Sequence, residues 1–495
     1  MLNVDCLLFI FDELLDKKSL RSCLLVNREW CSLVAPILWK LYSWYNIEKS
    51  IVFNKTINTI LSCLPISSKQ ILSDNNIKLP STILLKPPLF NYISFCEFPS
   101  SEVINKITGF VLGNFNSDDK INCFEREIYK LFIGRITNVK ELIWQTSQPI
   151  SSFPGASTCF SQLNNLTIDL NYVDSKALFV MSQICKTLDF LEILHCSHDL
   201  PGLISLIDAQ RNLKKVHLYT RRGTCKELSK ALARKGNTIN VLYLNLISNI
   251  PPSFLISLVN LTHIAIYNDE NNEFTDSEIN KFQQYLSISE FPNLQSLSVI
   301  GLSCFKELAM LIEKTNGNIS RIHIDTTNRF AQNTGMLIKA IVKSCPIIKK
   351  LTTYLEPKDF IHVKSLLIKC RHLEEIVFDN LNIFVNDIGD ELFDILTKYS
   401  PMSLIDISIS SVWKCSIDVF ELFFESCRER TLLNFNIIYN SKNYITENHR
   451  QVVRRPHVCL TSGFYEKVEG GGVFNIYNKI LEILGNFEKF QKNII

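Results

Sequence analysis

The chain has 495 residues, of which 46% are hydrophobic, 20% charged and 11% aromatic, and this composition excludes the disordered, collagenous and membrane classes. Its 52 lysines and arginines against 49 aspartates and glutamates give a formal net charge of +3, far from the strongly basic balance of nucleic-acid-binding proteins. We therefore expect a large globular protein that binds neither nucleic acid nor a membrane.

The first residues are not expected to form a targeting segment. The apolar run 6–11 lacks a basic flank and is bordered by Asp5, Asp12 and Glu13, so it does not predict a signal peptide. No stretch approaches the roughly 18 apolar residues that a membrane-spanning helix needs. We expect a cytoplasmic or nuclear location, where the 16 cysteines are reduced and serve mostly as small core residues.

Three short helices are predicted between residues 5 and 42. Apolar side chains recur at helical spacing after Asp5, after Asp16 and after Asn27, and each of these residue types can cap a helix. Pro36 is expected to bend or end the third helix and to leave the residues behind it on a following turn. Burying one large apolar side chain contributes only about 1.5–3 kcal/mol, and so small a unit buries few of them. Its surplus of apolar surface therefore predicts a partner.

The apolar and aromatic residues of this segment keep a recognisable order. They are Leu7, Leu8, Ile10, Phe11 and Leu14 in the first helix, then Leu20, Cys23, Leu24, Val26, Asn27, Arg28 and Trp30, and finally Leu38 and Trp39. In this order and spacing the segment resembles the F-box motif, although the Leu-Pro pair with which that family usually opens is absent. The stretches CLLVNREWC, PILWK and LPSTILLKPPLFNYISFCEF also resemble the large F-box families of filamentous fungi.

The resemblance implies that residues 1–45 are an F-box, a docking surface for the Skp-type adaptor of a cullin-RING ubiquitin ligase. The residues that it assigns to adaptor binding are Leu7, Leu8, Ile10, Phe11, Leu14, Leu20, Leu24, Val26, Trp30, Leu33, Leu38 and Trp39. The alternative is that the same helices only cap the rest of the protein and have no link to ubiquitin.

Residues 46–135 are predicted to form a helical spacer. They contain prolines at 65, 80, 87, 88 and 99, but the stretch PPLFNYISF from Pro87 has too many aromatic residues for a free linker. We expect an ordered segment that sets the distance between adaptor and substrate.

A repeat of the form apolar-x-x-apolar-x-apolar dominates residues 136–440. Its copies begin at Val139, Leu163, Leu191, Leu213, Ile239, Leu261, Leu294, Ile319, Ile348, Leu373, Leu404 and Leu432. They are about 27 residues apart on average, which is a leucine-rich-repeat period. The alternating apolar residues at the end of each copy predict a short strand.

Helices are predicted between these strands, for example from Asp174, Asp276, Asn333 and Ile417. One strand and one helix cannot bury their apolar faces alone, so neighbouring units stack. The predicted fold class is therefore α/β: a three-helix F-box followed by a curved leucine-rich-repeat solenoid, with parallel strands on the concave face and helices on the convex face. An F-box followed by such repeats is a familiar pairing, and it implies that the repeats bind a protein substrate for ubiquitination.

Cysteines recur where these helices end, at positions 185, 345, 370 and 427. Because they occupy the same place in successive repeats, we interpret them as fillers of one small apolar niche rather than as metal or redox sites. In this respect the repeat resembles the cysteine-containing class found in adaptor proteins, although it lacks that class's regular asparagine after the strand.

The substrate surface is predicted on the outward face of the strands, between the apolar anchors. The candidate substrate-binding residues are His217, Tyr219, Tyr243, Asn245, Tyr267, His323, Asp325 and Asp379. Tyrosines among polar residues suit a protein or peptide ligand, because they make large contacts at little cost in conformational entropy.

Residues 441–495 are predicted to cap the repeats with a loop, a polar strand, a glycine turn at 470–472 and a closing helix. That glycine cluster lacks the Gly-Lys-Ser/Thr of a P-loop. Zinc ligation by His195, Cys196 and His198 is not expected, because His195 and Cys196 are strand neighbours that point to opposite faces. Neither a Gly-x-Ser-x-Gly nor a His-Glu-x-x-His motif occurs. We expect no cofactor, no metal and no catalytic site.

Overall fold

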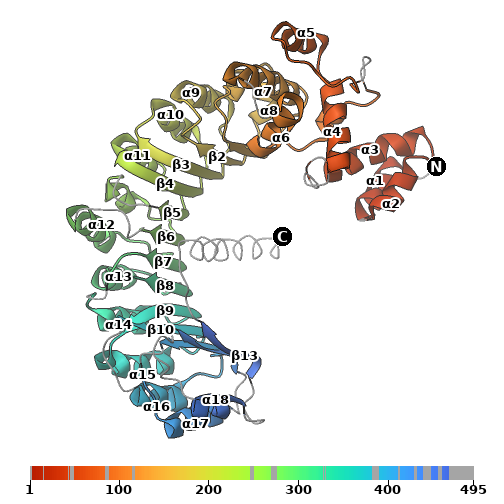
Figure 1. Cartoon of the computed structure of the whole chain (residues 1–495). Helices are drawn as coiled ribbons and strands as arrows, with labels where there is room; N and C mark the ends of the chain where they lie inside the picture. Colours follow the sequence, from red (N-terminus) through yellow and green to blue (C-terminus); the bar gives the residue numbers. More distant parts are fainter. Residues whose placement is uncertain are drawn as a thin grey trace. The chain divides into compact units, whose positions relative to one another are not determined.

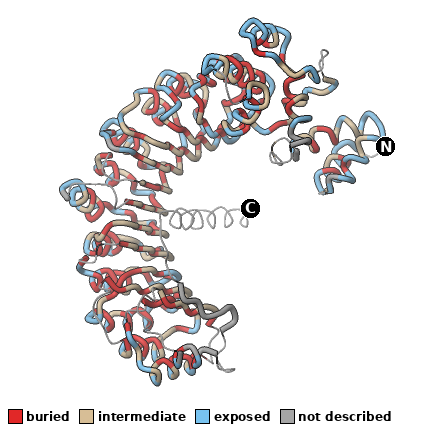
Figure 2. Tube along the Cα trace, in the orientation of Figure 1, coloured by how far each residue is buried: buried red, intermediate tan, exposed pale blue. Residues whose placement is uncertain are grey.

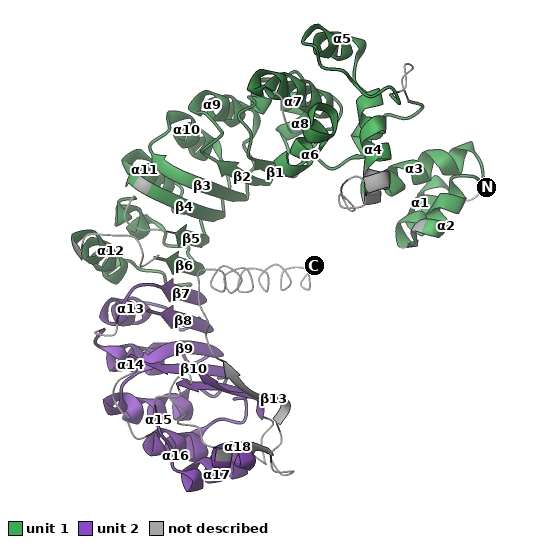
Figure 3. Ribbon diagram, in the orientation of Figure 1, with its two compact units in different colours: residues 1–294 green, residues 295–495 purple. Residues whose placement is uncertain are grey.

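The computed structural model covers the whole chain and describes residues 3–14, 16–42, 44, 50–83, 88–113, 117–245, 250–268, 276–326, 328, 331–381, 389–410, 413–427, 432–438, 447–454 and 460–467. The chain divides into two compact units, Met1–Leu294 and Gln295–Ile495 (Figure 3).

Three helices open the first unit; the second and third begin at the expected capping residues, whereas the first is capped by Asn3, two residues before the expected Asp5. They are α1 (Val4–Glu13), α2 (Lys17–Cys23) and α3 (Arg28–Tyr42). The Asp16 carboxylate accepts hydrogen bonds from the backbone N–H groups of Lys18 and Ser19, at 3.1 and 2.9 Å. The side-chain oxygen of Asn27 accepts from the N–H of Trp30 at 2.8 Å. Each acceptor satisfies donors that the first turn of a helix leaves unpaired.

Pro36 was predicted to bend or end the third helix; it lies inside α3, so the helix does not end there. A proline in a helix interior removes one backbone hydrogen bond. In α3 this loss is offset by packing, because Val34 and Leu38, on either side of the proline, are both buried. Leu38 and Trp39 therefore lie on the helix rather than on a following turn.

The spacer forms four α-helices and a 3₁₀ turn within its described residues. These are α4 (Ser50–Ser62), α5 (Ile66–Asp74), η1 (Tyr92–Phe95), α6 (Ser101–Leu112) and α7 (Asp118–Ile133). The aromatic stretch packs on α3: the rings of Trp39 and Tyr92 lie 4.6 Å apart, and Trp39 Nε1 donates to Cys96 Sγ at 2.9 Å. Between α5 and α7, Ser68 donates to the buried carboxylate of Glu127 at 2.7 Å.

Strands and helices alternate through the rest of the first unit (Figure 1). The strands are β1 (Glu141–Trp144), β2 (Asn165–Asp169), β3 (Phe190–His198), β4 (Lys215–Thr224), β5 (Val241–Asn245) and β6 (His263–Tyr267). From β1 to β6, each strand pairs in parallel with its neighbour in the chain within this unit. The helices and turns are η2 (Ile150–Ser152), α8 (Ala156–Phe160), α9 (Ser175–Ile184), α10 (Pro201–Ala209), α11 (Lys226–Arg234), η4 (Pro252–Ser257) and α12 (Asp276–Ile288).

The second unit continues the alternation. Its strands are β7 (Ser296–Ile300), β8 (Arg321–Asp325), β9 (Lys350–Leu355), β10 (Glu375–Asn380), β11 (Asp406–Ser410), β12 (Leu432–Ile438) and β13 (Leu460–Lys467), again parallel and in chain order. Its helices and turns are α13 (Phe305–Ile312), α14 (Thr334–Ser344), η5 (Pro357–Asp359), α15 (Phe360–Lys369), α16 (Asp390–Tyr399), α17 (Ile417–Ser426) and α18 (Glu447–Arg454). The expected loop near residue 450 is therefore a helix, α18. The glycine turn at 470–472 and the closing helix lie outside the described residues.

The α/β class and the repeat are confirmed, because each of the twelve predicted copies contains a strand. The apolar anchors of the copies are buried: in the second copy Leu163, Leu166 and Ile168 have no exposed surface. Figure 2 shows this burial following the strands and the inner faces of the helices. The architecture within each unit is that of a leucine-rich-repeat-like solenoid, in which neighbouring copies share one continuous core.

Strand register corrects the position of the third copy. Leu191 on β3 pairs with Leu166 on β2 and with Val216 on β4, and these are the second anchors of their own copies. The third copy therefore begins at Leu188, which is buried, and not at Leu191. It starts 25 residues after Leu163 and 25 before Leu213, so the apparent irregularity of the period at this point disappears.

The four helix-ending cysteines are buried, as predicted. The thiol of Cys185 lies 3.7 Å from the carbonyl oxygen of Leu163, the first anchor of the same copy, and that of Cys370 lies 3.7 Å from the carbonyl oxygen of Cys345 in the preceding copy. Burial raises the pKa of the thiols of Cys185 and Cys370 to about 11 and that of Cys345 to about 12. Such thiols stay protonated and unreactive, which agrees with a packing role.

Candidate functional site

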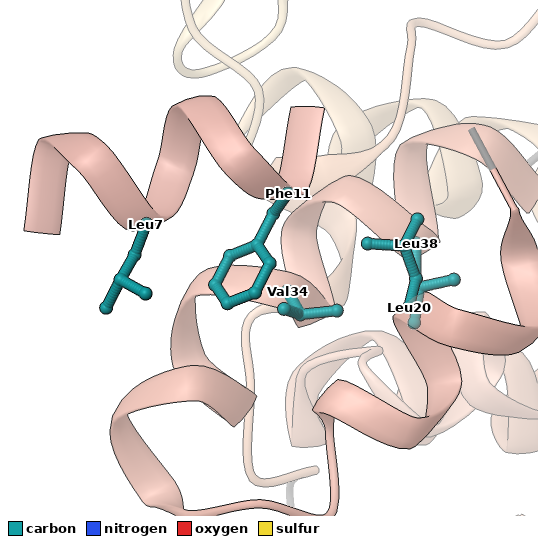
Figure 4. Packing of buried hydrophobic residues seen from close by; sticks show 5 residues of the cluster. All are labelled: Leu7, Phe11, Leu20, Val34 and Leu38. Carbon is teal, nitrogen blue, oxygen red and sulfur yellow. The ribbon is translucent and has the colours of Figure 1, made fainter. Parts of the chain in front are cut away.

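The three N-terminal helices close a small core of their own (Figure 4). Its buried members are Leu7, Phe11, Leu20, Val34 and Leu38, and the residues packed against it are Leu14, Cys23, Leu24, Trp30, Leu33 and Ile37. The rings of Trp30 and Phe11 meet edge to face at 5.0 Å. Most residues that the F-box resemblance assigns to adaptor binding therefore also hold these helices together.

A second set of apolar side chains from the same helices is exposed. Ile10 and Val26, two of the predicted adaptor-binding residues, are 43% and 56% exposed. Phe9 and Leu25, which the sequence interpretation missed, are 70% and 88% exposed. We call Phe9, Ile10, Leu25 and Val26 the exposed apolar set. In the sequence, Phe9 lies two residues from both Leu7 and Phe11, so helical phase already placed it away from the core they share.

The remaining predicted adaptor-binding residues have other surroundings. Leu8 is half-buried, and Trp39 contacts the spacer at Tyr92 and Cys96. A cavity of about 340 Å³ lies beside Trp39. Its lining residues are Arg21, Leu24, Cys31, Ala35, Leu38, Trp39, Lys55, Thr56, Thr59, Phe90 and Tyr92. Trp39 thus joins the three helices to the spacer.

On the first unit's sheet, the candidate substrate residues form a connected aromatic strip. His217 pairs with Tyr243 across β4 and β5, and Tyr219 pairs with Asn245. The His217 ring lies 4.7 Å from Phe190 and 5.4 Å from Tyr243, whose ring lies 5.3 Å from Tyr219. We call Phe190, His217, Tyr219 and Tyr243 the aromatic strip. Tyr243 itself is buried, so the accessible part of the strip is the half-buried rings around it.

Glu192 is the charged neighbour of this strip, and the sequence interpretation missed it because the third copy was placed in the wrong register. The register pairs Glu192 with Thr167 and His217. Thr167 Oγ1 donates to its carboxylate at 2.9 Å, and His217 Nδ1 lies 3.8 Å from it. Burial raises the pKa of Glu192, but the nearby imidazole of His217 and the hydrogen bond from Thr167 outweigh this effect and leave the pKa below its ordinary value. The side chain is therefore a carboxylate at neutral pH.

On the second unit's sheet, two candidate aspartates flank a tyrosine. Tyr354 Oη donates to Asp325 at 2.6 Å, and Asp379 on β10 pairs with Tyr354 on β9. Burial, together with the charges of Asp325 and Asp379, raises the pKa of Tyr354, so the phenol keeps its proton and remains a donor. Tyr354 was not among the predicted substrate residues, although it follows the same outward pattern.

The other candidate substrate residues lie on the same outward rows. Tyr267 pairs with Asn245, and the Asn245 carbonyl accepts from Thr220 Oγ1 at 3.1 Å. His323 pairs with Ser298 and Thr352. Register thus brings the candidates of β4, β5 and β6 together on one unit, and those of β8 and β10 on the other.

Metal-binding geometry is not found among the described residues, where no group of three or more His, Cys, Asp or Glu side chains could hold an ion. Cys196 is buried against Cys225, with their sulfur atoms 3.5 Å apart, while the imidazole of His195 contacts Asp169. The expected separation of His195 and Cys196 is therefore observed. Within the same described part of the chain, none of the helices is both long and apolar enough to cross a membrane.

Comparison with known proteins gives little similarity. No protein-family model matches the chain, and no curated protein matches it. The leucine-rich-repeat-containing protein LegL7 from Legionella pneumophila has 14% identity and a TM-score of 0.31, over 58% of this chain and 97% of that chain. A chain of the Rad7 and Elc1 complex in yeast has 14% identity and a TM-score of 0.35, over 68% of this chain and 77% of that chain. Because both TM-scores are low, the repeat assignment rests on the period and strand register described above.

Proposed function

We propose that this protein is a non-catalytic substrate receptor of a cullin-RING ubiquitin ligase. In this proposal the three N-terminal helices dock a Skp-type adaptor, and the outward face of the repeat sheets binds a protein substrate. The protein contributes no catalytic group and needs no cofactor, since transfer of ubiquitin is the work of the other ligase subunits.

The observation that carries the proposal is the exposed apolar set. The core of Leu7, Phe11, Leu20, Val34 and Leu38 is already closed, so Phe9 and Leu25 are not needed to complete it. Two pairs of large apolar side chains, Phe9 with Ile10 and Leu25 with Val26, are thus left exposed on a small helical unit, and such exposure favours an interface. Their position on the segment that resembles an F-box favours the Skp-type adaptor as the partner.

The alternative is that the helices merely cap the repeats, and it predicts that the exposed apolar set would be buried. A cap covers its apolar side chains with the structure that it protects, as the anchors of the repeats are covered by their neighbours. Phe9, Ile10, Leu25 and Val26 instead stay more than two-fifths exposed. This difference favours an external partner over an internal cap.

The repeat face supports the substrate half of the proposal. Tyrosine and other aromatic residues are enriched among the side chains that dominate binding at protein interfaces, and the aromatic strip gathers four rings from three adjacent strands. Because the side chains of the strip already contact one another, a ligand meets a surface that loses little conformational entropy on binding.

Co-purification with a Skp-type adaptor tests the adaptor half. The full chain and the adaptor are mixed and analysed by gel filtration, where the proposal expects a 1:1 complex. Phe9→Asp and Leu25→Asp should each abolish that complex while thermal unfolding of the chain stays unchanged, because both side chains are exposed. Ile66→Asp is the matched control: Ile66 is an equally exposed apolar residue, but it lies on α5.

Each result is informative. A complex lost with Phe9→Asp and kept with Ile66→Asp supports docking through the exposed apolar set. If the folded wild-type chain and the folded adaptor do not associate, the proposal fails, and the repeats are then a protein-interaction scaffold with no ubiquitin role.

A further inference from the structure

The cavity beside Trp39 lies where the N-terminal helices meet the spacer, and we call it the junction cavity. Its lining comes from α2 and α3 of the N-terminal helices and from α4 and residues 90–92 of the spacer. The turn η1 packs against both α3 and α4, so the parts of this lining hold one another in place. The volume of about 340 Å³ falls within the range of roughly 300–1,000 Å³ that is typical of small-molecule sites.

Most of the cavity wall is apolar, and part of it is aromatic. Aliphatic residues of the N-terminal helices form one part, and Trp39, Phe90 and Tyr92 form another. The Tyr92 ring lies 4.6 Å from that of Trp39, at a tilt, and 5.8 Å from that of Phe90, edge to face. Rings in such an arrangement offer both faces and edges to a further ring, so the wall suits a ligand with a flat aromatic body.

Two polar groups of the wall have no partner in the part of the chain that the structure describes. The hydroxyl of Tyr92 makes no hydrogen bond there, and the ammonium of Lys55 makes no ion pair. Burial is the main cause that raises the pKa of Tyr92, so the phenol keeps its proton at neutral pH and can donate it to a hydrogen bond. Both groups are therefore donors for an acceptor carried by a ligand.

The charged groups of the cavity wall are positive. Arg21 and Lys55 line the cavity, and none of the described residues in the lining is acidic. Arg21 has interactions of its own within the chain, so Lys55 is the cation that we assign to a ligand. Beside the cavity, the thiol of Cys63 contacts the backbone of Tyr92, and the charges that act on this thiol are those of Arg135 and Lys69.

Three described acidic residues lie close to the lining residues in the sequence. Asp16, Glu29 and Glu97 are exposed and stand outside the lining. They keep their negative charges, so the positive character belongs to the cavity wall and not to the whole region. A ligand with one anionic group inside the cavity matches this local charge.

We infer that the junction cavity binds a small aromatic carboxylic acid. Its ring system lies among Trp39, Phe90 and Tyr92, and its carboxylate pairs with Lys55 and accepts a hydrogen bond from the Tyr92 hydroxyl. Because such a ligand contacts the N-terminal helices and the spacer together, its binding stabilises the junction between them. The cavity shares no residue with the exposed apolar set or the aromatic strip, and the inference depends on neither half of the proposed function.

Naphthalene-2-carboxylate is the probe, and naphthalene-2-carboxamide, which has nearly the same shape but no charge, is the control ligand. Binding of each to the full chain at pH 7 is measured by ligand-detected NMR titration. We expect Lys55→Met to weaken binding of the carboxylate by about tenfold, because a charge-assisted hydrogen bond is lost. Tyr92→Phe removes an uncharged donor and should weaken it by about threefold. Lys78→Met makes the same change at an exposed spacer lysine outside the lining, and should leave the affinity within about twofold.

Cysteine alkylation locates the bound probe. Cys31 is a half-buried residue of the cavity lining, whereas Cys6 is exposed and lies outside it. Naphthalene-2-carboxylate should slow the reaction of Cys31 with iodoacetamide and leave that of Cys6 unchanged. Mass spectrometry of the peptides that contain these two cysteines measures both rates.

The inference is overturned if the carboxylate does not bind, if the carboxamide binds equally well, or if Lys78→Met weakens binding as much as Lys55→Met. Binding that leaves the alkylation of Cys31 unchanged would place the probe elsewhere and would also overturn it. Loss of an adaptor complex with Lys55→Met, in a chain that does not bind the carboxylate, would assign the cavity to the adaptor instead of a small acid.

Discussion

The three N-terminal helices and the repeats bury their apolar residues to different extents. In the second repeat copy all three anchors have no exposed surface, while Phe9 and Leu25 of the N-terminal helices are mostly exposed. The difference follows from geometry. A strand and helix inside an array have neighbours on both sides, whereas three short helices enclose only as many side chains as fit between them. Surplus apolar surface on a unit of the second kind favours binding to a partner, and this is the basis of the proposed adaptor role.

Among the substitutions considered, Phe11→Ala should have the largest effect on the difference between the N-terminal helices and the repeats. Phe11 is buried in the N-terminal core, and truncating a buried phenylalanine costs about 3–5 kcal/mol. We expect hydrogen exchange to show loss of protection in residues 4–42 and unchanged protection in β2–β5, because the repeats have their own core. Equal loss of protection in both regions would mean that the three helices are an integral cap of the repeats.

Leu166→Ala tests the repeat side. Leu166 on β2 is fully buried between neighbouring copies, so its truncation should lower the free energy of unfolding by about 2–5 kcal/mol. Leu25→Ala is the matched change at an exposed leucine and should stay within about 0.5 kcal/mol of the wild type. Urea denaturation followed by circular dichroism measures both. Similar costs for the two variants would contradict the difference in burial.

Gly202→Ala and Gly109→Ala compare how tightly the backbone is packed around a glycine in the repeats and in the spacer. A Cβ at Gly202 would lie 1.9 Å from the carbonyl oxygen of Ser175, where α10 packs on α9, so the change should cost about 1–3 kcal/mol. Gly109 lies inside α6 with nothing within 4 Å of its would-be Cβ, so alanine there should stabilise by about 0.5–1 kcal/mol. Thermal unfolding should move in opposite directions for the two variants, and a shift in the same direction would refute the packing contrast.

Asp406→Asn should have the smallest effect, and one that depends on pH. Burial raises the pKa of Asp406, although Asn434 Nδ2 donates to its carboxylate at 2.9 Å. Because the folded state then holds this proton more tightly than the unfolded state, stability falls as pH rises through the window between the two pKa values. At pH 7 the asparagine variant should exceed the wild type in unfolding free energy by less than about 1 kcal/mol.

The advantage of Asp406→Asn should disappear below about pH 4, where the carboxyl is protonated in the unfolded state as well. Urea denaturation at pH 7 and at pH 3 measures the difference. An advantage that is equally large at both pH values would show that ionisation of Asp406 is not its cause.

Local sequence predicted much of the fold, because helix capping and the alternation of apolar residues in strands depend on residues that are close together in the chain. Asp16 and Asn27 marked helix starts through their own backbone hydrogen bonds, and the twelve repeat copies marked strands through alternation. The same rules failed at Pro36, where burial of Val34 and Leu38 sustains a helix that local propensity alone would end. They also placed the third copy at Leu191, because Leu188 and Leu191 both fit the pattern and only pairing with β2 distinguishes them.

The candidate sites depended more on tertiary structure. Helical spacing identified the apolar residues of the N-terminal helices, but it did not separate Phe11, which is buried, from Ile10, which is exposed. Alternation of apolar and polar residues identified His217, Tyr219 and Tyr243. That Phe190 and Glu192 lie beside His217 became clear only from the register of β3. His195 looked like part of an isolated short motif, and Asn171, whose side chain contacts His195 in the structure, carried no signal at all.

By itself the sequence determined the repeat, its strands and helices, the buried cysteine niche and the presence of three apolar N-terminal helices. These features recur at short, regular spacing, and hydrophobic periodicity reports them directly. The tertiary structure alone decided the strand register, which apolar side chains lie outside the N-terminal core, and which polar side chains of successive copies, such as Asp169 and His195, come into contact. Those outcomes depend on contacts between residues that are about 25 positions apart, and neither local propensity nor periodicity encodes which of them will touch.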